Sequence, residues 1–225
     1  MNVDIVHIPT KNVNSVHIVW KNGGMERPNY HHGALEAALV EAAVEVARAE
    51  GPAALSVRSI AAAVGVSPAA VYRHFDSLDH LVAAVSQFGR EELARALLVA
   101  RARPTTGRTK AAQARQRMAE VGRAYIRFAI DEPRLFDTAY TACSALPARM
   151  DDPSAWQVLL DCVADLEATG VISSKMAADA PIIAWSGVHG LATILVRGVT
   201  VEPLAVDASI DTIVEALLRS VEQRR

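Results

Sequence analysis

The 225 residues contain only two cysteines, Cys143 and Cys162. Two thiols are too few for a disulfide framework or for a zinc site with paired cysteines, so a reducing compartment is expected. An excess of charge is also missing, because 23 Lys and Arg stand against 25 Asp and Glu, for a formal net charge of −2. Any nucleic-acid or membrane partner must therefore be recognised through the local placement of charge.

Long apolar runs are scarce as well. Charged residues or histidines interrupt the apolar stretches before about 18 residues, so we expect no membrane span. The first residues include Asp4, His7 and Pro9 and do not resemble a secretory signal. We therefore expect a soluble, cytoplasmic protein. With 51% hydrophobic and 21% charged residues, the chain has a globular composition and is long enough for one large or two small domains.

Motifs of the common enzyme classes are absent. The sequence has no P-loop, no GxGxxG dinucleotide motif and no GxSxG nucleophile motif. The pair His31-His32 has no further metal-binding side chains at helical spacing. The sequence therefore predicts a protein that is not an enzyme and that needs no cofactor and no metal.

Residues 1–24 differ from the rest of the chain. The segments VDIVHI and SVHIVW alternate as short strands do, and KNGG then signals a turn. Two interpretations are open. Met25 is the physiological start and the preceding residues belong to an over-extended reading frame, or residues 1–24 form a real N-terminal arm.

A helical period of 3.6 residues runs through the chain from residue 33 onward. Leu35, Leu39 and Ala43, for example, share one face of the first predicted helix. Because no convincing strand pattern follows residue 25, the predicted fold is all-α with about nine helices. The predicted helices span residues 33–50, 56–64, 68–75, 77–103, 108–131, 135–141, 156–169, 180–197 and 209–221.

The second and third predicted helices form a helix–turn–helix candidate. Ser56 can cap the first of them, Gly65 can supply the left-handed backbone of the turn, and Ser67 with Pro68 can begin the second. In such a motif the second helix lies in the major groove of DNA, with its N-terminal residues at the base edges. A small helical hairpin with a solvated face is the alternative.

The outer face of the second helix carries groups that suit DNA. Ala69 and Ala70 are small enough to allow close approach to the bases. Tyr72, Arg73 and His74 are predicted to face outward as hydrogen-bond donors.

These residues resemble a known family. The run LSVRSIAAAVGVSPAAVYRHFDSLDHLVAAV at residues 55–85 resembles the DNA-binding domain of TetR-type transcriptional regulators. The preceding segment, YHHGALEAALVEAAVEVARAEGPAAL, is similar to the first helix of that family. Further on, WSGVHG at residues 185–190 resembles the signature of the WHG-type C-terminal domain found in some TetR-like regulators.

The resemblance implies a homodimeric repressor that a small-molecule effector releases from double-stranded operator DNA. It divides the chain into a possible N-terminal extension at 1–24, a helix–turn–helix domain at 25–77, and an effector-binding and dimerisation domain at 78–225. The residues that the resemblance and the local charge assign to DNA are Arg27, His31, Ser56, Arg58, Ser67, Ala69, Ala70, Tyr72, Arg73 and His74.

Two features motivate an alternative function. A lysine commonly follows the phenylalanine of the family motif, whereas Ser77 and Leu78 stand here, so one phosphate contact is expected to be missing. Residues 25–80 also hold four arginines against seven acidic residues. The alternative is a small-molecule binding or sequestering protein whose helix–turn–helix no longer recognises a specific operator.

Aromatic side chains in the second half of the chain suit an apolar effector pocket. Taken singly, each of them is also typical of a protein core. For His189, pocket lining and an internal hydrogen bond are both open. The candidate pocket residues are Met118, Tyr125, Phe128, Phe136, Tyr140, Trp156, Trp185 and His189.

An apolar stripe on the last predicted helix, together with apolar residues of the preceding one, suits a four-helix dimer interface. A core within one chain is the alternative. The candidate interface residues are Ile183, Leu191, Ile194, Ile213, Val214, Leu217 and Val221.

Residues 90–127 form a basic stretch, with ten Lys and Arg against three Glu. The favoured interpretation is a solvated helix face. The alternative is attraction of an anionic effector, such as a carboxylate or a phosphate-bearing metabolite.

Overall fold

The computed structural model describes residues 31–140, 154–198 and 205–222, with side chains from residue 33 onward. Arg27, Cys143, residues 1–24 and the side chain of His31 lie outside this part. Every secondary-structure element in this part is a helix, which confirms the all-α prediction. The described helices are α1 (His31–Glu50), η1 (Pro52–Ala54), α2 (Val57–Val64), α3 (Pro68–Val71), α4 (Leu78–Arg101), α5 (Lys110–Asp131), α6 (Pro133–Ala139), α7 (Ala155–Ala168), α8 (Ser174–Val196) and α9 (Val206–Val221).

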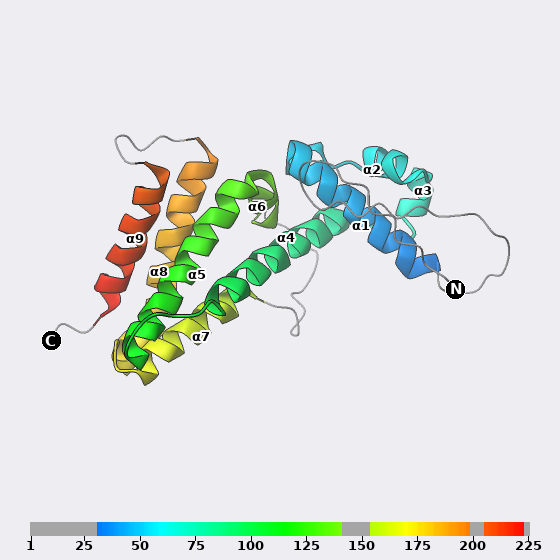
Figure 1. Cartoon of the computed structure of the whole chain (residues 1–225). Helices are drawn as coiled ribbons and strands as arrows, with labels where there is room; N and C mark the ends of the chain where they lie inside the picture. The colour runs from blue at the N-terminus through cyan, green and yellow to red at the C-terminus, as the bar shows by residue number, and fades with distance from the viewer. Residues whose placement is uncertain (1–30, 141–153, 199–204, 223–225) are drawn as a thin grey trace, which may run out of the picture.

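Two helical bodies are joined by α4 (Figure 1). At one end, α1, α2 and α3 gather around the start of α4. At the other, α5 and α7 pack on α4, and α8 and α9 pack on α5. The short helix α6 lies between the two bodies and contacts α1, α4 and α5.

The smaller body has its own core. Leu39 of α1, Ile60 of α2 and Val71 of α3 are completely buried against one another and against Phe75 and Leu81. Because one apolar side chain from each helix meets in this core, burial fixes how the helices cross.

The helix–turn–helix forms where the sequence predicts it. Ser56 Oγ accepts a hydrogen bond from the Ser59 amide at 3.1 Å, and Ser67 Oγ accepts one from the Ala70 amide at 3.3 Å. Both serines therefore cap the helix that follows them. Gly65 has φ 76°, in the left-handed region that glycine adopts without steric cost.

The helix α3 is shorter than predicted and ends at Val71 instead of Phe75. The chain continues in turns, in which the Arg73 amide donates to the Ala70 carbonyl at 3.3 Å and the His74 amide donates to the Val71 carbonyl at 2.9 Å. Bonds with this three-residue spacing wind the backbone more tightly than an α-helix. The Phe75 amide still donates to the Val71 carbonyl at 3.0 Å with α-helical spacing, so the last predicted turn is mixed and not a regular α-helix.

The helix α4 belongs to both bodies. Ser77 caps it by accepting a hydrogen bond from the His80 amide at 3.1 Å. Near its start Leu81 is buried in the core of the smaller body, whereas Leu93, further along, is buried in the core of the larger one. One continuous helix therefore links the helix–turn–helix to the rest of the chain.

The helix α8 begins at Ser174, six residues before its predicted start. Ser173 Oγ caps it by accepting from the Met176 amide at 3.2 Å, and Pro181 lies buried inside the helix. By length and composition alone α8 could cross a membrane, although Asp179 and His189 interrupt its apolar run. It packs against α5, α7 and α9, and a core helix of a globular protein passes the same test.

Part of the predicted dimer interface is core. Val214 and Val221 of α9 are each 3% exposed and pack within the chain. The reason is that the apolar stripe of α9 faces α5 and α8. These two residues therefore belong to the core within one chain, which was the alternative interpretation. Ile183, Leu191, Ile213 and Leu217 are half-buried, and Ile194 is exposed.

Candidate DNA-binding surface and effector cavity

The helix–turn–helix presents most of the residues predicted to contact DNA. Arg58, Ser67, Ala69, Tyr72 and Arg73 are exposed, with Tyr72 at 54% of its full accessibility. Ser56 and Ala70 are half-buried. All seven lie on α2, on α3, or on the cap and turn residues that adjoin them.

His74 is the exception. Its side chain is only 6% exposed, and Nδ1 lies 3.9 Å from Glu36 Oε2 of α1. The prediction that His74 faces outward is therefore wrong. The tight turns after Val71 direct this side chain back toward α1.

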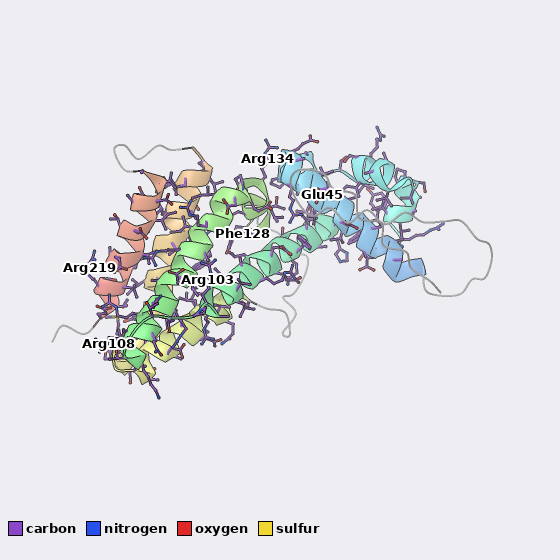
Figure 2. All side chains as sticks on the ribbon, viewed as in Figure 1. Glu45, Arg103, Arg108, Phe128, Arg134 and Arg219 are labelled. Atoms are coloured by element: carbon purple, nitrogen blue, oxygen red, sulfur yellow. The ribbon has the colours of Figure 1, made fainter. Side chains whose placement is uncertain are left out.

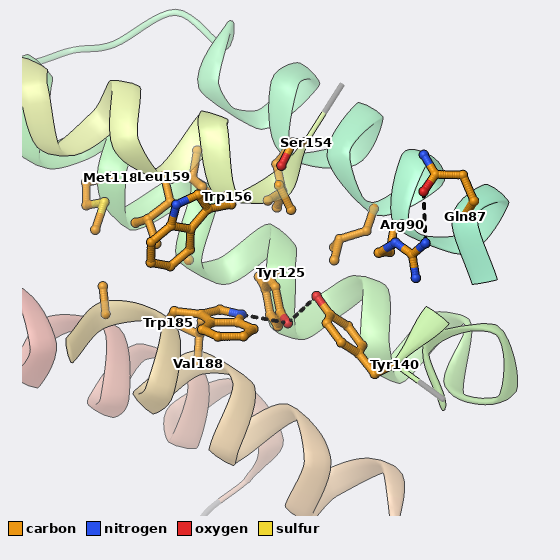
Figure 3. Close-up of a pocket in the computed structure, with 16 residues that line it drawn as sticks. Gln87, Arg90, Met118, Tyr125, Tyr140, Ser154, Trp156, Leu159, Trp185 and Val188 are labelled. Atoms are coloured by element: carbon orange, nitrogen blue, oxygen red, sulfur yellow. Dashed lines mark hydrogen bonds between the residues drawn. The ribbon is translucent and has the colours of Figure 1, made fainter. Parts of the chain in front are cut away.

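A cavity of about 400 Å³ lies between α4, α5, α7 and α8 (Figure 3). Its volume is within the range of small-molecule sites. Five of the eight predicted pocket residues line it, namely Met118, Tyr125, Tyr140, Trp156 and Trp185. The indole rings of Trp156 and Trp185 meet edge to face, with centroids 5.7 Å apart.

The other three predicted pocket residues do not line the cavity. Phe136 is buried, and the centroid of its ring lies 5.0 Å from the ring centroid of Tyr140 and 5.6 Å from that of His189. Phe128 packs on the main core. Phe136 and His189 therefore support the cavity wall from behind.

Sequence reasoning missed the residues that α4 contributes. Gln87, Arg90, Leu93 and Leu97 line the cavity, and the first two are polar. Arg90 Nη2 donates to Gln87 Oε1 at 2.9 Å, which holds the guanidinium at the cavity. Arg90 stood in the basic stretch, but nothing in the pattern distinguished it from the nine other basic residues there.

Tyr125 is the centre of a hydrogen-bonded cluster. Its hydroxyl accepts from Trp185 Nε1 at 3.3 Å and donates to Tyr140 Oη at 2.8 Å. His189 Nδ1 lies 2.8 Å from the same hydroxyl. Because the single phenolic proton goes to Tyr140, His189 Nδ1–H is the donor in this arrangement. Of the two interpretations open for His189, the structure therefore supports the internal hydrogen bond, because His189 does not line the cavity.

Most of the basic stretch is paired with carboxylates. Arg101 Nη2 lies 3.0 Å from Asp165 Oδ2, and Arg123 Nε lies 2.7 Å from Asp211 Oδ1. Seven of the ten basic side chains form such ion pairs, namely Arg95, Arg101, Arg103, Arg115, Arg117, Arg123 and Arg127. Of the remaining three, Arg108 and Lys110 are exposed, and Arg108 lies at the end of the molecule far from the helix–turn–helix (Figure 2).

The thiol of Cys162 is a core group. The residue is completely buried, and burial raises the pKa of the thiol to about 11. Since the thiolate is the reactive form, this cysteine is unreactive at neutral pH. Within the described ranges, no three His, Cys, Asp or Glu side chains form a group that could hold a metal ion.

The environment of His189 predicts a dependence of stability on pH. Burial lowers the pKa of His189 below its ordinary value of 6.5. The unfolded chain then binds a proton more readily than the folded one, so acid favours unfolding. We expect the free energy of unfolding to fall between about pH 7 and pH 5, and to fall less in His189→Gln. Urea denaturation at each pH measures the free energy of unfolding of the unmodified protein and of the variant. If this free energy fell equally with pH in the two proteins, His189 would not be the group responsible.

Two known protein families match this chain, one over each of the two helical bodies. Residues 39–85 match the family described as bacterial regulatory proteins, tetR family. Residues 118–218 match the family described as tetracyclin repressor-like, C-terminal domain. No curated protein matches the chain.

Several solved structures share the fold. A protein with unknown function from Rhodococcus sp. RHA1 is 27% identical, with a TM-score of 0.71, over 88% of this chain and 100% of its own. A TetR family transcription regulator from Marinobacter aquaeolei VT8 is 18% identical, with a TM-score of 0.56, over 85% of this chain and 97% of its own. The TetR family transcriptional regulator PfmR from Thermus thermophilus is 19% identical, with a TM-score of 0.52, over 82% of this chain and 99% of its own.

The two family matches fall on the helix–turn–helix body and on the body that holds the cavity, in the order that the sequence resemblance implied. The chain therefore belongs to the TetR family of DNA-binding transcriptional regulators.

Proposed function

We propose that this regulator is a homodimeric repressor that leaves its operator when a small molecule occupies the cavity between α4, α5, α7 and α8. The observation that carries the proposal is the shared helix α4. Leu81 of α4 packs in the helix–turn–helix core, and Arg90 of the same helix lines the cavity. A ligand that binds better to one position of α4 would shift the population toward the matching position of the DNA-binding body.

The short helix α6 supplies a second connection between the two bodies. On α4, the buried Ser86 Oγ donates to the Thr138 carbonyl at 2.8 Å. One turn later, Arg90 Nη1 donates to the Ala139 carbonyl at 3.1 Å. A ligand in contact with Arg90 would therefore act on α4 and on the end of α6 together.

The opposite side of α6 faces α1. Glu132, which precedes α6, has Oε2 3.4 Å from Arg48 Nε of α1. Figure 2 places Arg134 of α6 beside the part of α1 that carries Glu45. This contact supports a path from the cavity through α6 to the first helix of the DNA-binding body.

For the DNA-binding body we assign residues 25–77, with the first part of α4 completing its core. Ser56, Arg58, Tyr72 and Arg73 would contact phosphates or base edges. Ser67, Ala69 and Ala70 would approach the base edges in the major groove. Residues 78–225 would bind the effector and dimerise. The family consists of transcriptional regulators, which are not enzymes.

For the dimer interface we assign the outer faces of α8 and α9. Ile182 and Ile194 of α8 are 52% and 40% exposed, although they are large apolar residues. They lie twelve positions apart, which is about 120° around the helix, so an interface that covers both takes a broad face of α8. A second copy of the chain would cover them, as interfaces of identical subunits commonly do.

Charging this face is expected to separate the subunits. We expect Ile182→Asp/Ile194→Asp to halve the molar mass measured by light scattering, because two carboxylates cannot be buried unpaired in an apolar interface. Val99→Asp is the matched control, since Val99 is 64% exposed on α4. A double variant that keeps the mass of the unmodified protein would place the interface elsewhere.

Operator recognition is tested by fluorescence anisotropy of the purified protein on DNA that flanks its own gene, with random duplex as competitor. We expect tight binding that resists the competitor and weakens with salt. Equal binding to both duplexes would lead to selection from random DNA. If that selection also returned no preferred sequence, the proposed repressor function would be contradicted.

A further inference from the structure

The effector cavity has two chemically different ends. In Figure 3 Met118, Leu159 and Trp156 lie toward one end, and Gln87 and Arg90 lie at the other. The first end is apolar, whereas the second presents an amide and a guanidinium. A molecule that fills the cavity therefore meets apolar walls along one part of its length and a cationic group at the other.

Arg90 differs from its basic neighbours in the same stretch. Seven of them are neutralised by carboxylates, whereas no carboxylate in the described ranges forms an ion pair with Arg90. The partners of Arg90 are neutral, namely the Gln87 amide oxygen and the Ala139 carbonyl. The carboxylate of Glu91 accepts from Gln87 Nε2 at 2.9 Å, but Glu91 does not line the cavity and forms no ion pair with Arg90 in this part of the protein.

The guanidinium also has hydrogen-bonding capacity to spare. It carries five N–H donors, and these two hydrogen bonds use one donor on each terminal nitrogen. Because the two neutral partners hold the group in place, a ligand would meet an oriented donor set at little further cost in side-chain entropy. A planar carboxylate matches that donor geometry.

The hydroxyl groups at this end are neutral. Burial raises the pKa of Tyr125 and of Tyr140, so neither phenol ionises in the physiological range. Tyr140 lines the cavity beside Arg90 and adds a polar contact without adding negative charge. Among the described residues that line the cavity, Arg90 is therefore the charged one.

We propose that the cavity selects an elongated apolar molecule with an anionic head group of the carboxylate type, and that Arg90 binds the head group. This inference rests on the proposed effector role of the cavity and names the chemical class of the effector. At about 30 Å³ for each non-hydrogen atom, a cavity of about 400 Å³ holds a molecule of roughly a dozen such atoms. Decanoate has this size and shape.

The test compares three probes of one chain length, which are decanoate, decanol and decylamine, by titration calorimetry with the full-length protein. We expect decanoate to bind at least about tenfold more tightly than decanol, and decylamine to bind most weakly, because a hydrogen-bonded charge pair contributes at least this much. Arg90→Gln should remove the advantage of decanoate and leave decanol binding unchanged. Arg90→Lys should retain part of it.

The matched control is Arg95→Gln, which removes an exposed arginine of the same helix that is paired with Glu92. It should leave all three affinities unchanged, and thermal unfolding followed by circular dichroism checks that every variant is folded. Equal affinity for decanoate and decanol, tightest binding by decylamine, or an unchanged preference in Arg90→Gln would each overturn the proposal.

A second readout separates this inference from the proposed function. If decanoate binds through Arg90 but does not release the operator, the assigned ligand class stands and the proposed effector role of the cavity fails. If decanol binds as tightly as decanoate and releases the operator, the effector role stands and the assigned ligand class is wrong.

Discussion

Replacing Tyr72 and Arg73 by alanine is expected to weaken operator binding about tenfold for each substitution and about a hundredfold for both together. Both side chains are exposed beside α3, where a recognition helix meets DNA. Because neither is part of the core, the free energy of unfolding should change by less than about 0.5 kcal/mol.

The salt dependence of binding distinguishes the roles of these two residues. Each lost phosphate contact should lower the slope of log affinity against log salt by about 0.9. A loss of affinity that depends on the base sequence of the duplex would instead indicate a contact with a base edge. Anisotropy at several salt concentrations, on specific and random duplexes, measures both effects.

The control for this experiment is Arg95→Ala, which removes an exposed arginine of α4 outside the helix–turn–helix. It should leave operator affinity and the salt slope unchanged. If the double variant Tyr72→Ala/Arg73→Ala bound the operator as well as the unmodified protein does, the assignment of the recognition surface would be wrong.

The second large effect is expected from Tyr125→Phe, which removes one oxygen atom from the centre of the buried cluster. Trp185 Nε1 and His189 Nδ1 then lose their acceptor, and Tyr140 loses its donor. A buried polar group without a partner costs about 1–3 kcal/mol, so we expect the free energy of unfolding to fall by about 2 kcal/mol or more. Urea denaturation with unchanged m-value would report this loss directly.

Tyr72→Phe is the matched control, because it removes the same atom from a tyrosine that is 54% exposed. Its free energy of unfolding should stay within about 0.5 kcal/mol of the unmodified value. If Tyr125→Phe and Tyr72→Phe had the same free energy of unfolding, the hydrogen bonds of the Tyr125 hydroxyl would contribute no more to stability than hydrogen bonds to water do.

The helix–turn–helix was predictable because its determinants are local in sequence. Ser56 and Ser67 cap helices that start within two residues of them, and Gly65 adopts the positive φ that the turn requires. The outward orientation of His74 was not predictable in this way. It depends on where α3 stops and on Glu36 of α1, a residue distant in sequence.

The cavity was only partly predictable. Aromatic composition pointed to Tyr125, Tyr140 and Trp185, all of which line it. Composition does not show which aromatic ring faces a cavity and which lies behind the wall, and Phe136 and His189 lie behind it.

Taken by itself, the sequence determined the helical fold, the positions of most helix ends and the DNA-binding motif, because period, caps and turn residues act over a few positions. Only the tertiary structure decided which neighbour covers each helix face. It placed Val214 inside the chain and left Ile194 exposed, and it brought Tyr125 to within 2.8 Å of His189 across 64 positions. A hydrophobic period shows which residues share a face, whereas the packing of distant helices determines what that face meets.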